Sequence, residues 1–483
     1  MMTSDSLWRH WAAVRPEHLA LRTADESYNW RTLAKKVDAL AAHLSAQGVA
    51  SGDVVTVIGK NSPALVFLHL ACLQLGVTTA FVMPQPAIRL SEKLAVLYRP
   101  GQPHWVWFGP VQPDDPSDSA NKADGLPMRA DITLLDLDAA FSSAPRKEAV
   151  PETACRSERL ASILFTSGSE GVPKAVAHTQ AQHLASARGL LAVFSFQPSD
   201  CWLLSLPLYH VSGLAIVYRW LSVGACLKVG RGALAQDIQD VTHASLVVTQ
   251  LKRLLERQPP LSLSQVLLGG SDVPVALCQQ AAQQGIQTWL GYGMTEAAST
   301  VTAKQIDGIA TAGRVLPNRQ VQLINNRILI GGDTLASGYF HQGKITPLVD
   351  AQGWFDTRDL GQWIDGELRI LGRADNQFIS GGENIHCEEI EGVLNRHPAI
   401  RQSMVIPVAC EVYGARPVAL IDTSEELTAL NLTPWLANRL ERFKFPDTFY
   451  RMPQLPQTGM KVSRKAMKDW LMLRRNTATT PCA

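Results

Sequence analysis

The chain has 483 residues, of which 46% are hydrophobic and 18% are charged, and its formal net charge is +2. This length exceeds what one hydrophobic core usually supports, so we expect two or more domains. The composition is that of an ordinary globular enzyme. The near-zero net charge gives no indication of a nucleic-acid partner, and none is expected.

The sequence shows no feature of a membrane or an oxidising compartment. Residues 1–19 lack the apolar core of a signal peptide. The most apolar run, 64–77, is interrupted by His69 and Gln74 and is too short to span a bilayer. The eight cysteines form no C-x-x-C pair and no zinc-type cluster with histidine. We therefore expect a cytoplasmic protein with free thiols and no membrane span.

Helical periodicity alternates with short β-branched runs over the first 330 residues. An amphipathic helix is predicted at 33–44, ended by Gly48, and a buried helix at 64–75. Buried strands are predicted at 54–58, 162–165, 202–206, 245–249, 265–268 and 288–290. Such alternation predicts a largely parallel α/β sheet. The polar stretch 110–125 is predicted to be a surface loop.

The pattern changes after about residue 310. Asn325-Asn326 and Asp365-Gly366 each lie between two short apolar runs, which predicts two β-hairpins in an antiparallel or barrel-like segment. A polar turn then leads into a new region of strands and helices. We place the domain boundary there, with an N-terminal domain at 1–373 and a C-terminal domain at 374–483.

Residues 166–174, Thr-Ser-Gly-Ser-Glu-Gly-Val-Pro-Lys, follow a predicted buried strand. The loop offers closely spaced backbone N–H groups, three hydroxyls and one ammonium, which are the groups that hold a polyphosphate. It lacks the G-x-x-x-x-G-K-[ST] spacing of the NTPase P-loop. A flexible turn without a ligand is the alternative interpretation.

A second glycine-rich element, 291–296, reads Gly-Tyr-Gly-Met-Thr-Glu. Tyr292 between two glycines could lie flat against a planar base, and Thr295 and Glu296 could then contact a phosphate and its metal ion. The alternative is a strand-to-helix turn in which Glu296 is an acid at a helix N-terminus.

Two further elements carry charge near the end of the chain. Asp359, in an apparent tight turn, could accept from both hydroxyls of a ribose, and Arg373 lies fourteen residues later across a hairpin. In the alternative interpretation, Asp359 is only a turn residue and Arg373 lies at a solvated strand end. Lys461 lies in a glycine-containing loop, where a lysine is usually only solvated. The acidic run 388–391 is interpreted as the structural opening of a helix.

In this order and spacing, these elements resemble the adenylate-forming superfamily of acyl-CoA synthetases, luciferases and adenylation domains, over essentially the whole chain. The resemblance implies an α/β fold with a large N-terminal domain of mixed and parallel sheets, a β-barrel-like segment and a small, mobile α+β C-terminal domain. It implies ATP and coenzyme A as substrates and Mg²⁺ as the metal. Asp375 would be the hinge, and Lys461 the catalytic lysine of the mobile domain.

The superfamily resemblance also assigns the remaining roles. Glu296 and Thr166 would hold the metal, and these two residues with Lys461 and His210 would be catalytic. The residues implied to bind the nucleotide are Thr166, Ser167, Gly168, Ser169, Gly171, Lys174, Gly269, Gly291, Tyr292, Gly293, Met294, Thr295, Asp359 and Arg373. The phosphate loop departs from the superfamily at Glu170, where threonine is usual. This extra carboxylate should weaken triphosphate binding unless Lys174 or a metal ion offsets it.

The segments 8–11, 203–213, 219–221, 242–247 and 266–270 are similar to the o-succinylbenzoate–CoA ligase family of menaquinone biosynthesis. The implied acid carries a second carboxylate on its ring, and a buried anion needs a partner. Arg219 is the candidate partner, with a structural ion pair as the alternative. The residues expected to contact the acid are His210, Ser212, Arg219 and Ser245.

Other functions stay open on the sequence. They are another aryl- or short acyl-CoA ligase, a stand-alone adenylation enzyme that loads a carrier protein, and a non-catalytic nucleotide-binding relative. The last stays open because Glu170 departs from the usual phosphate loop. The partners expected are small molecules, namely the acid, ATP and coenzyme A. The oligomeric state is open, with a homo-oligomer as one option.

Overall fold

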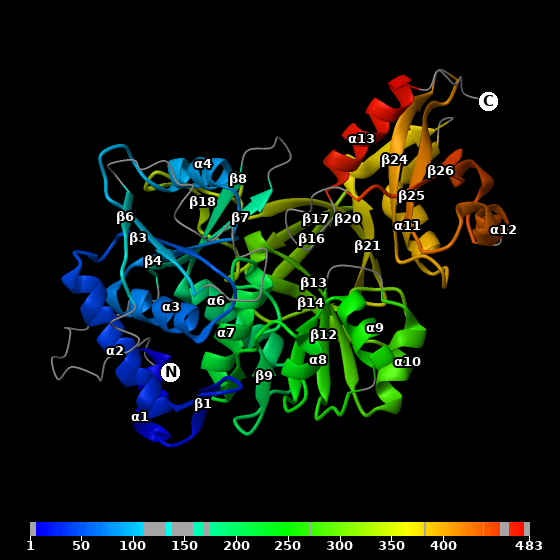
Figure 1. Cartoon of the computed structure of the whole chain (residues 1–483). Helices are drawn as coiled ribbons and strands as arrows, with labels where there is room; N and C mark the ends of the chain where they lie inside the picture. Colours follow the sequence, from blue (N-terminus) through cyan, green and yellow to red (C-terminus); the bar gives the residue numbers. More distant parts are fainter. Residues whose placement is uncertain are drawn as a thin grey trace. The chain divides into compact units, whose positions relative to one another are not determined.

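The computed structural model describes residues 6–110, 132–137, 158–167, 173–257, 259–269, 273–380, 383–410, 412–437, 439–454 and 463–477. The chain forms two compact units (Figure 1): Met1–Val321 with Ile330–Phe355, and Gln322–Leu329 with Asp356–Ala483. The boundary expected after Arg373 lies within the second unit and stays a prediction. Among the described residues, no helix combines the length and apolar character needed to cross a membrane.

The first unit contains a nine-stranded sheet whose order is β15-β14-β13-β12-β11-β9-β10-β1-β2. The neighbours from β13 through β12, β11, β9 and β10 to β1 are parallel, and the remaining pairs at both edges are antiparallel. Its strands are β1 Leu19–Arg22, β2 Ser27–Asn29, β9 Cys201–Leu203, β10 Cys226–Lys228, β11 His243–Leu246, β12 Gln265–Gly269, β13 Gln287–Met294, β14 Ser299–Gln305 and β15 Arg314–Val315.

An eight-stranded sheet of the same unit has the order β19-β18-β8-β7-β4-β3-β5-β6. Its strands are β3 Val54–Ile58, β4 Thr78–Val82, β5 His104–Phe108, β6 Ile132–Leu134, β7 Leu160–Ser167, β8 Pro173–Thr179, β18 Gly338–His341 and β19 Lys344–Thr346. The strands from β6 to β7 are parallel, whereas β7, β8, β18 and β19 run antiparallel. The largely parallel sheets predicted from the alternation are confirmed, with antiparallel edges added.

The helices of the first unit are α1 Leu7–Val14, α2 Trp30–Ala46, α3 Pro63–Leu75, α4 Ala87–Leu97, α6 Gln180–Leu191, α7 Val211–Val223, α8 Leu234–Asp237, α9 Val248–Arg257 and α10 Val275–Gln283. Helix α3 begins at a serine N-cap followed by proline and ends at Gly76, whose φ of 72° suits a residue without a Cβ. Helix α6 contacts strands of both sheets, including β8 and β14.

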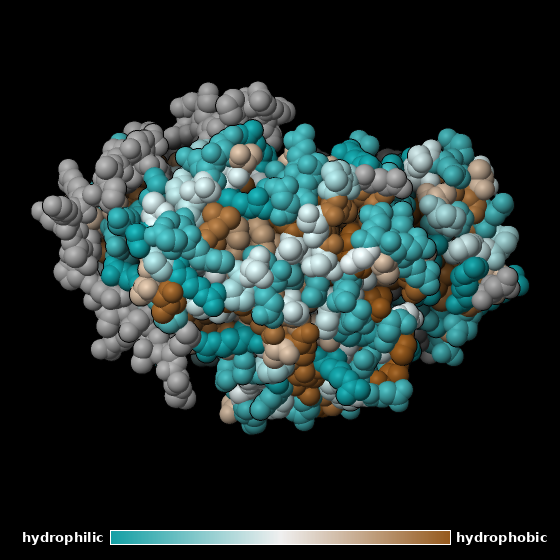
Figure 2. All heavy atoms as spheres, turned by 90° about the horizontal axis from the view of Figure 1, so that it is seen from below, coloured by the Kyte–Doolittle hydropathy of each residue, from teal (hydrophilic) through white to brown (hydrophobic). Residues whose placement is uncertain are grey.

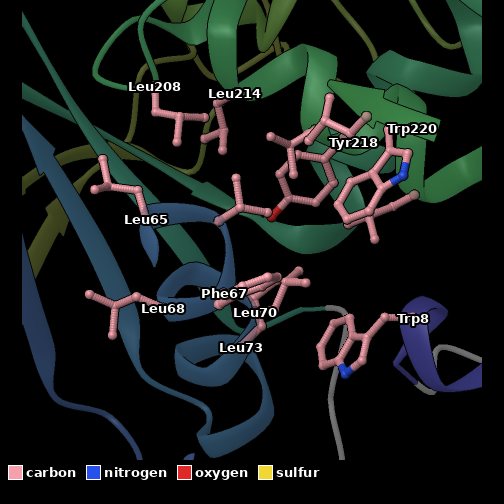
Figure 3. Close-up of a cluster of buried hydrophobic side chains, with 14 of the residues drawn as sticks. Trp8, Leu65, Phe67, Leu68, Leu70, Leu73, Leu208, Leu214, Tyr218 and Trp220 are labelled. Atoms are coloured by element: carbon pink, nitrogen blue, oxygen red, sulfur yellow. The ribbon is translucent and has the colours of Figure 1, made fainter. Parts of the chain in front are cut away.

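The main core lies around α3 and α7. Side chains from both helices, with Trp8 of α1, converge on one apolar cluster (Figure 3). Trp30 stacks on Trp220 with ring centroids 5.1 Å apart. This packing fixes α7, which together with its N-cap residue carries three of the residues expected to contact the acid. On the face shown in Figure 2, hydrophilic residues predominate and hydrophobic ones form separate small patches.

The second unit contains most of a four-stranded sheet of order β16-β17-β20-β21 and a sheet of β23-β22-β25-β24 with β26 paired to β25. The strands are β16 Gln320–Ile324, β17 Arg327–Gly331, β20 Phe355–Ile364, β21 Glu367–Arg373, β22 Gln377–Ser380, β23 Glu383–His386, β24 Gln402–Cys410, β25 Gly414–Asp422 and β26 Thr448–Arg451. The helices are α11 Cys387–Asn395, α12 Leu432–Ala437 and α13 Arg464–Thr477.

Both predicted hairpins are confirmed. Asn325 and Asn326 have φ values of 50° and 63°, and Asp365 and Gly366 have 48° and 79°. Two consecutive residues with positive φ are the signature of the tight turn whose twist matches that of paired strands. The acidic run 388–391 does open a helix, α11.

Two predicted strands are wrong at their ends. Strand β9 stops at Leu203 because the carbonyls of Leu204 and Leu206 accept from the Asn61 side chain instead of a neighbouring strand. Strand β11 stops at Leu246, and α9 follows, because the Gln250 side chain accepts from the Val247 N–H and so opens a helix there. The predicted loop at 110–125 lies, after Pro110, outside the described residues.

Candidate active site

The predicted phosphate loop joins two antiparallel strands. Thr166 on β7 faces Lys174 on β8, and β7 runs parallel to β4, so Thr166 lies near the carboxyl end of a parallel strand. Such ends are where α/β sheets bind their ligands. Gly168, Ser169, Glu170 and Gly171 lie outside the described residues, as does the side chain of Ser167.

A tyrosine links the base of this loop to the second glycine-rich element. The Lys174 ammonium lies 5.0 Å from the centre of the Tyr339 ring, and the Tyr339 hydroxyl donates to the Glu296 carboxylate at 3.3 Å. Tyr339 occupies β18, beside β8. Across the described part of the chain, neither Lys174 nor Glu296 has an ion-pair partner. The fold therefore brings together two site elements that lie about 120 residues apart in sequence.

The second glycine-rich element is not the strand-to-helix turn of the alternative interpretation. Gly291, Tyr292, Gly293 and Met294 continue strand β13, and a short 3₁₀ turn with Thr295 and Glu296 leads back into the antiparallel strand β14. Glycine is required at 293, because a Cβ there would lie 1.8 Å from the Ser299 carbonyl oxygen. Gly269 ends β12 directly opposite Gly291.

Arg219 of α7 is buried, with 2% of its surface exposed, and no carboxylate of the described chain pairs with it. Within the described part of the chain, its guanidinium donates to two hydroxyls, Ser245 Oγ at 3.5 Å and Thr300 Oγ1 at 3.4 Å, and it lies over the Trp202 ring. Burial, with a contribution from the Arg319 charge, lowers the pKa of Arg219 to about 9. The structural ion pair of the alternative interpretation is therefore absent from the described residues.

Thr300 faces Gly293 across the β13–β14 pair, so Arg219 lies near the second glycine-rich element. His210 is the N-cap residue of α7, and Ser212 lies in its first turn. One helix thus carries three of the four residues expected to contact the acid. The fourth, Ser245, lies on β11.

In the second unit, Asp359 and Arg373 face each other on β20 and β21, with Arg373 Nη1 3.1 Å from Asp359 Oδ1. Arg373 Nε also lies 2.9 Å from Asp375 Oδ1, and its hydrogen bond lowers the pKa of Asp375. The predicted ribose pair and hinge residue are therefore adjacent. Asp359 lies within strand β20 and not in a tight turn, because residues 359–364 pair with β21; Arg358, directly before it, has a φ of 61°. Lys461 lies outside the described residues.

Sequence reasoning missed a column of buried aromatic rings in the first unit. His178 lies 4.7 Å from His183, which stacks on Tyr218 at 4.5 Å, and Tyr218 contacts His69. Burial lowers the pKa of His69 to about 3 and that of His178 to about 4, so both are neutral at pH 7. Strand alternation was the available signal: Lys174 and His178 are four residues apart and share one face of β8.

The family model for the AMP-binding enzymes matches residues 8–340, and the model for their C-terminal domain matches residues 389–461. The chain therefore belongs to the AMP-binding enzyme family.

Within that family, the chain is 41% identical to the 2-succinylbenzoate–CoA ligase of Salmonella typhimurium, over 98% of this chain and 99% of that protein. It is similar to a variant of Escherichia coli MenE with bound OSB-AMS, with a TM-score of 0.83, 39% identity and coverage of 98% and 99%. It is also similar to the Bacillus subtilis o-succinylbenzoate–CoA synthetase in complex with ATP and a magnesium ion, with a TM-score of 0.81, 25% identity and coverage of 96% and 99%.

Proposed function

We propose that the protein is an AMP-forming ligase that converts 2-succinylbenzoate, ATP and coenzyme A into 2-succinylbenzoyl-CoA, AMP and diphosphate. The acid is first joined to AMP, and the thiol of coenzyme A then displaces AMP from the acyl-adenylate. Relatives at 38–41% identity are 2-succinylbenzoate–CoA ligases, the family whose resemblance implies a role in menaquinone biosynthesis. Its substrates ATP and coenzyme A support a cytoplasmic location.

One observation in the structure supports this acid over a simple monocarboxylate. Arg219 is a buried cation that has two long hydrogen bonds to hydroxyls and no carboxylate within the described chain. A buried charge without a partner is costly, and a carboxylate of the ligand would remove that cost. Because an acyl-adenylate forms at one carboxylate, the acid needs a second one for Arg219. An aromatic dicarboxylate meets this requirement.

The nucleotide side of the site has the donors that a Mg²⁺–ATP complex requires. Glu296 offers a half-buried carboxylate without a cation partner among the described residues, and Thr166 offers a hydroxyl. No group of three or more His, Cys, Asp or Glu of the described chain could hold a metal. One carboxylate with substrate phosphates is a usual set of ligands for Mg²⁺, so these residues fit that ion. When bound, Mg²⁺ neutralises charge that develops on the phosphates.

The protein's own residues then have distinct roles in the first step. Lys174 supplies an ammonium beside the phosphate loop, and Tyr292 supplies a face for adenine. Asp359 accepts hydrogen bonds from the ribose, and Arg373 holds that carboxylate in place. Lys461 stabilises the charge that grows on the α-phosphate as the acid attacks. In the second step the lysine is not needed, and rotation about Asp375 gives the thiol access to the same site.

The test is pyrophosphate release from ATP with a panel of acids, measured with and without coenzyme A. We expect release with 2-succinylbenzoate, low release with benzoate or a short fatty acid, and thioester formation only when coenzyme A is present. Equal release with monocarboxylic aryl acids would contradict the proposed substrate. Release with 2-succinylbenzoate but no thioester would instead indicate an enzyme that loads a carrier protein.

A further inference from the structure

The turn that carries Glu296 has a strained backbone. Ala298 has a φ of 50° and Ser299 a φ of 96°, although both residues have a Cβ. Residues other than glycine, asparagine and aspartate rarely adopt this region, and they keep it only where the surrounding structure imposes it. Something in the fold must therefore hold residues 295–299 in this shape.

Two buried side chains donate to carbonyls on either side of Glu296. His178 Nε2 lies 2.8 Å from the Thr295 carbonyl oxygen, and Ser186 Oγ lies 2.5 Å from the Ala298 carbonyl oxygen. Since a carbonyl only accepts, Nε2 of His178 must carry the hydrogen, which fixes its tautomer. His178, Ser186 and Ala298 are buried, whereas Thr295 is partly exposed, and hydrogen bonds are strongest away from water.

A buried arginine sets the direction of the second bond. Arg319 Nη2 donates to Ser186 Oγ at 2.8 Å, so the hydroxyl keeps its own hydrogen for the Ala298 carbonyl. Arg319 has no carboxylate partner among the described residues, and its charge makes this chain of bonds a charge-assisted one. Two side chains thus donate to the turn. His178 donates to the Thr295 carbonyl, which also accepts from the Ala298 N–H, and the polarised Ser186 hydroxyl donates to the Ala298 carbonyl.

Both donors come from the segment that begins at the phosphate loop. Strand β8 carries Lys174 and His178 on one face, and α6, which carries Ser186, starts at the next residue after β8. The Thr179 side chain and Gln182 close a capping box at this junction, which fixes the start of the helix relative to the strand. A displacement of the phosphate-loop strand would therefore be transmitted to the turn that carries Glu296.

We propose that His178 and Ser186 are positioning residues that clamp the 295–299 turn and so hold Glu296 at the distance from Lys174 that the MgATP complex requires. This proposal rests on the proposed nucleotide chemistry, but not on which acid is the substrate. It predicts a specific loss of MgATP affinity when either donor is removed, and not a uniform loss of activity.

The variants are His178→Leu and Ser186→Ala, with His178→Gln to restore an N–H donor at a similar distance. The matched control is His69→Leu, which removes another buried imidazole of the same column that contacts Thr79 and Tyr218 but not the turn. The dissociation constant of MgATP is measured by calorimetry without acid. The KM for MgATP and for the acid are then measured in pyrophosphate release.

Loss of one buried hydrogen bond should raise the MgATP dissociation constant and KM of His178→Leu and Ser186→Ala by roughly tenfold. The KM for the acid should stay within about twofold, His178→Gln should recover most of the affinity, and His69→Leu should lose stability without a change in MgATP binding. Unchanged MgATP affinity in the folded variants, or an equal loss in His69→Leu, would overturn the clamp. If His178→Leu does not fold, Ser186→Ala still decides the matter. A wild-type protein that binds MgATP but releases no pyrophosphate with any acid would refute the ligase function while leaving this comparison valid.

Discussion

Replacement of Arg219 by methionine provides the sharpest test of substrate choice. Methionine keeps most of the side-chain volume, so the change removes the charge without opening a large cavity. The ring carboxylate of 2-succinylbenzoate would then lie in a partly dry pocket without its partner. Truncating one member of such a buried pair costs about 2–5 kcal/mol.

The surroundings of Arg219 indicate where within that range the cost of Arg219→Met lies. Arg219 is 2% exposed, which favours the upper half, whereas the two hydroxyls of Ser245 and Thr300 stay in place as neutral donors and favour the lower half. We expect about 3 kcal/mol, or roughly a 150-fold loss in kcat/KM for the dicarboxylate. Arg219→Lys keeps a charge but loses the planar guanidinium, so its kcat/KM for the dicarboxylate should lie between those of wild type and Arg219→Met.

The assay compares kcat/KM for 2-succinylbenzoate with that for an analogue that lacks the ring carboxylate, in wild type and Arg219→Met, as a double-mutant-type cycle. The analogue should lose little, because it has no group for the arginine. Stability gives a second measurement: removing an unpaired buried charge that also repels Arg319 should leave the free energy of unfolding of the free protein unchanged or higher. An equal loss for both acids, together with a clear loss of stability, would show that Arg219 is a structural residue.

Three further predictions concern other residues. Lys461→Ala should abolish pyrophosphate release but spare thioester formation from supplied acyl-adenylate; equal loss of both steps would contradict the two-conformation mechanism. Glu170→Thr should lower the KM for ATP and leave that for the acid unchanged, because it removes a like charge beside the phosphates; a higher KM for ATP would show that Glu170 assists binding. Acid should destabilise the fold, because burial lowers the pKa of His69 to about 3 and the unfolded chain takes up that proton near pH 6.5. Between pH 6.5 and pH 3 the unfolded state therefore holds more protons than the folded state. The free energy of unfolding falls over this range by up to about 1.4 kcal/mol per pH unit as the pH drops. Urea titrations at pH 7.5 and 5.0 should differ less in His69→Leu than in wild type, and the exposed His341→Gln should show the wild-type difference.

Local sequence signals predicted the elements that local physics determines. The two hairpins follow from Asn325-Asn326 and Asp365-Gly366, since few other dipeptides accept two positive φ values in succession. Strand β3 follows from its β-branched run at 54–58, and helix α3 follows from its apolar run at 64–75. The ends of β9 and β11 could not be predicted in the same way, because they depend on side chains, Asn61 among them, that compete for backbone carbonyls and N–H groups.

The site was predictable only in pieces. Each glycine-rich segment suggested a ligand, but nothing local indicated that Tyr339 would lie between Lys174 and Glu296, because this depends on β18 pairing with β8 from 160 residues away. The strain at Ala298 and Ser299 was equally hidden, since neither residue type favours positive φ. Long-range packing imposes both the position of Tyr339 and the strained turn, and the pattern of a single sequence does not predict such packing.

The charges of the first unit point to a site completed by its substrates. Lys174, Arg219 and Arg319 have no carboxylate partner among the described residues, and two of them are buried. Folding has therefore desolvated positive charge without neutralising it, at a cost to the stability of the free protein. Both proposed ligands, a triphosphate and a dicarboxylate, bring the missing negative charge. Ligand binding should then recover stability in proportion to occupancy, and the gain from 2-succinylbenzoate should disappear in Arg219→Met while the gain from MgATP remains. That separation would show that the two anions are bound by different cations of one site.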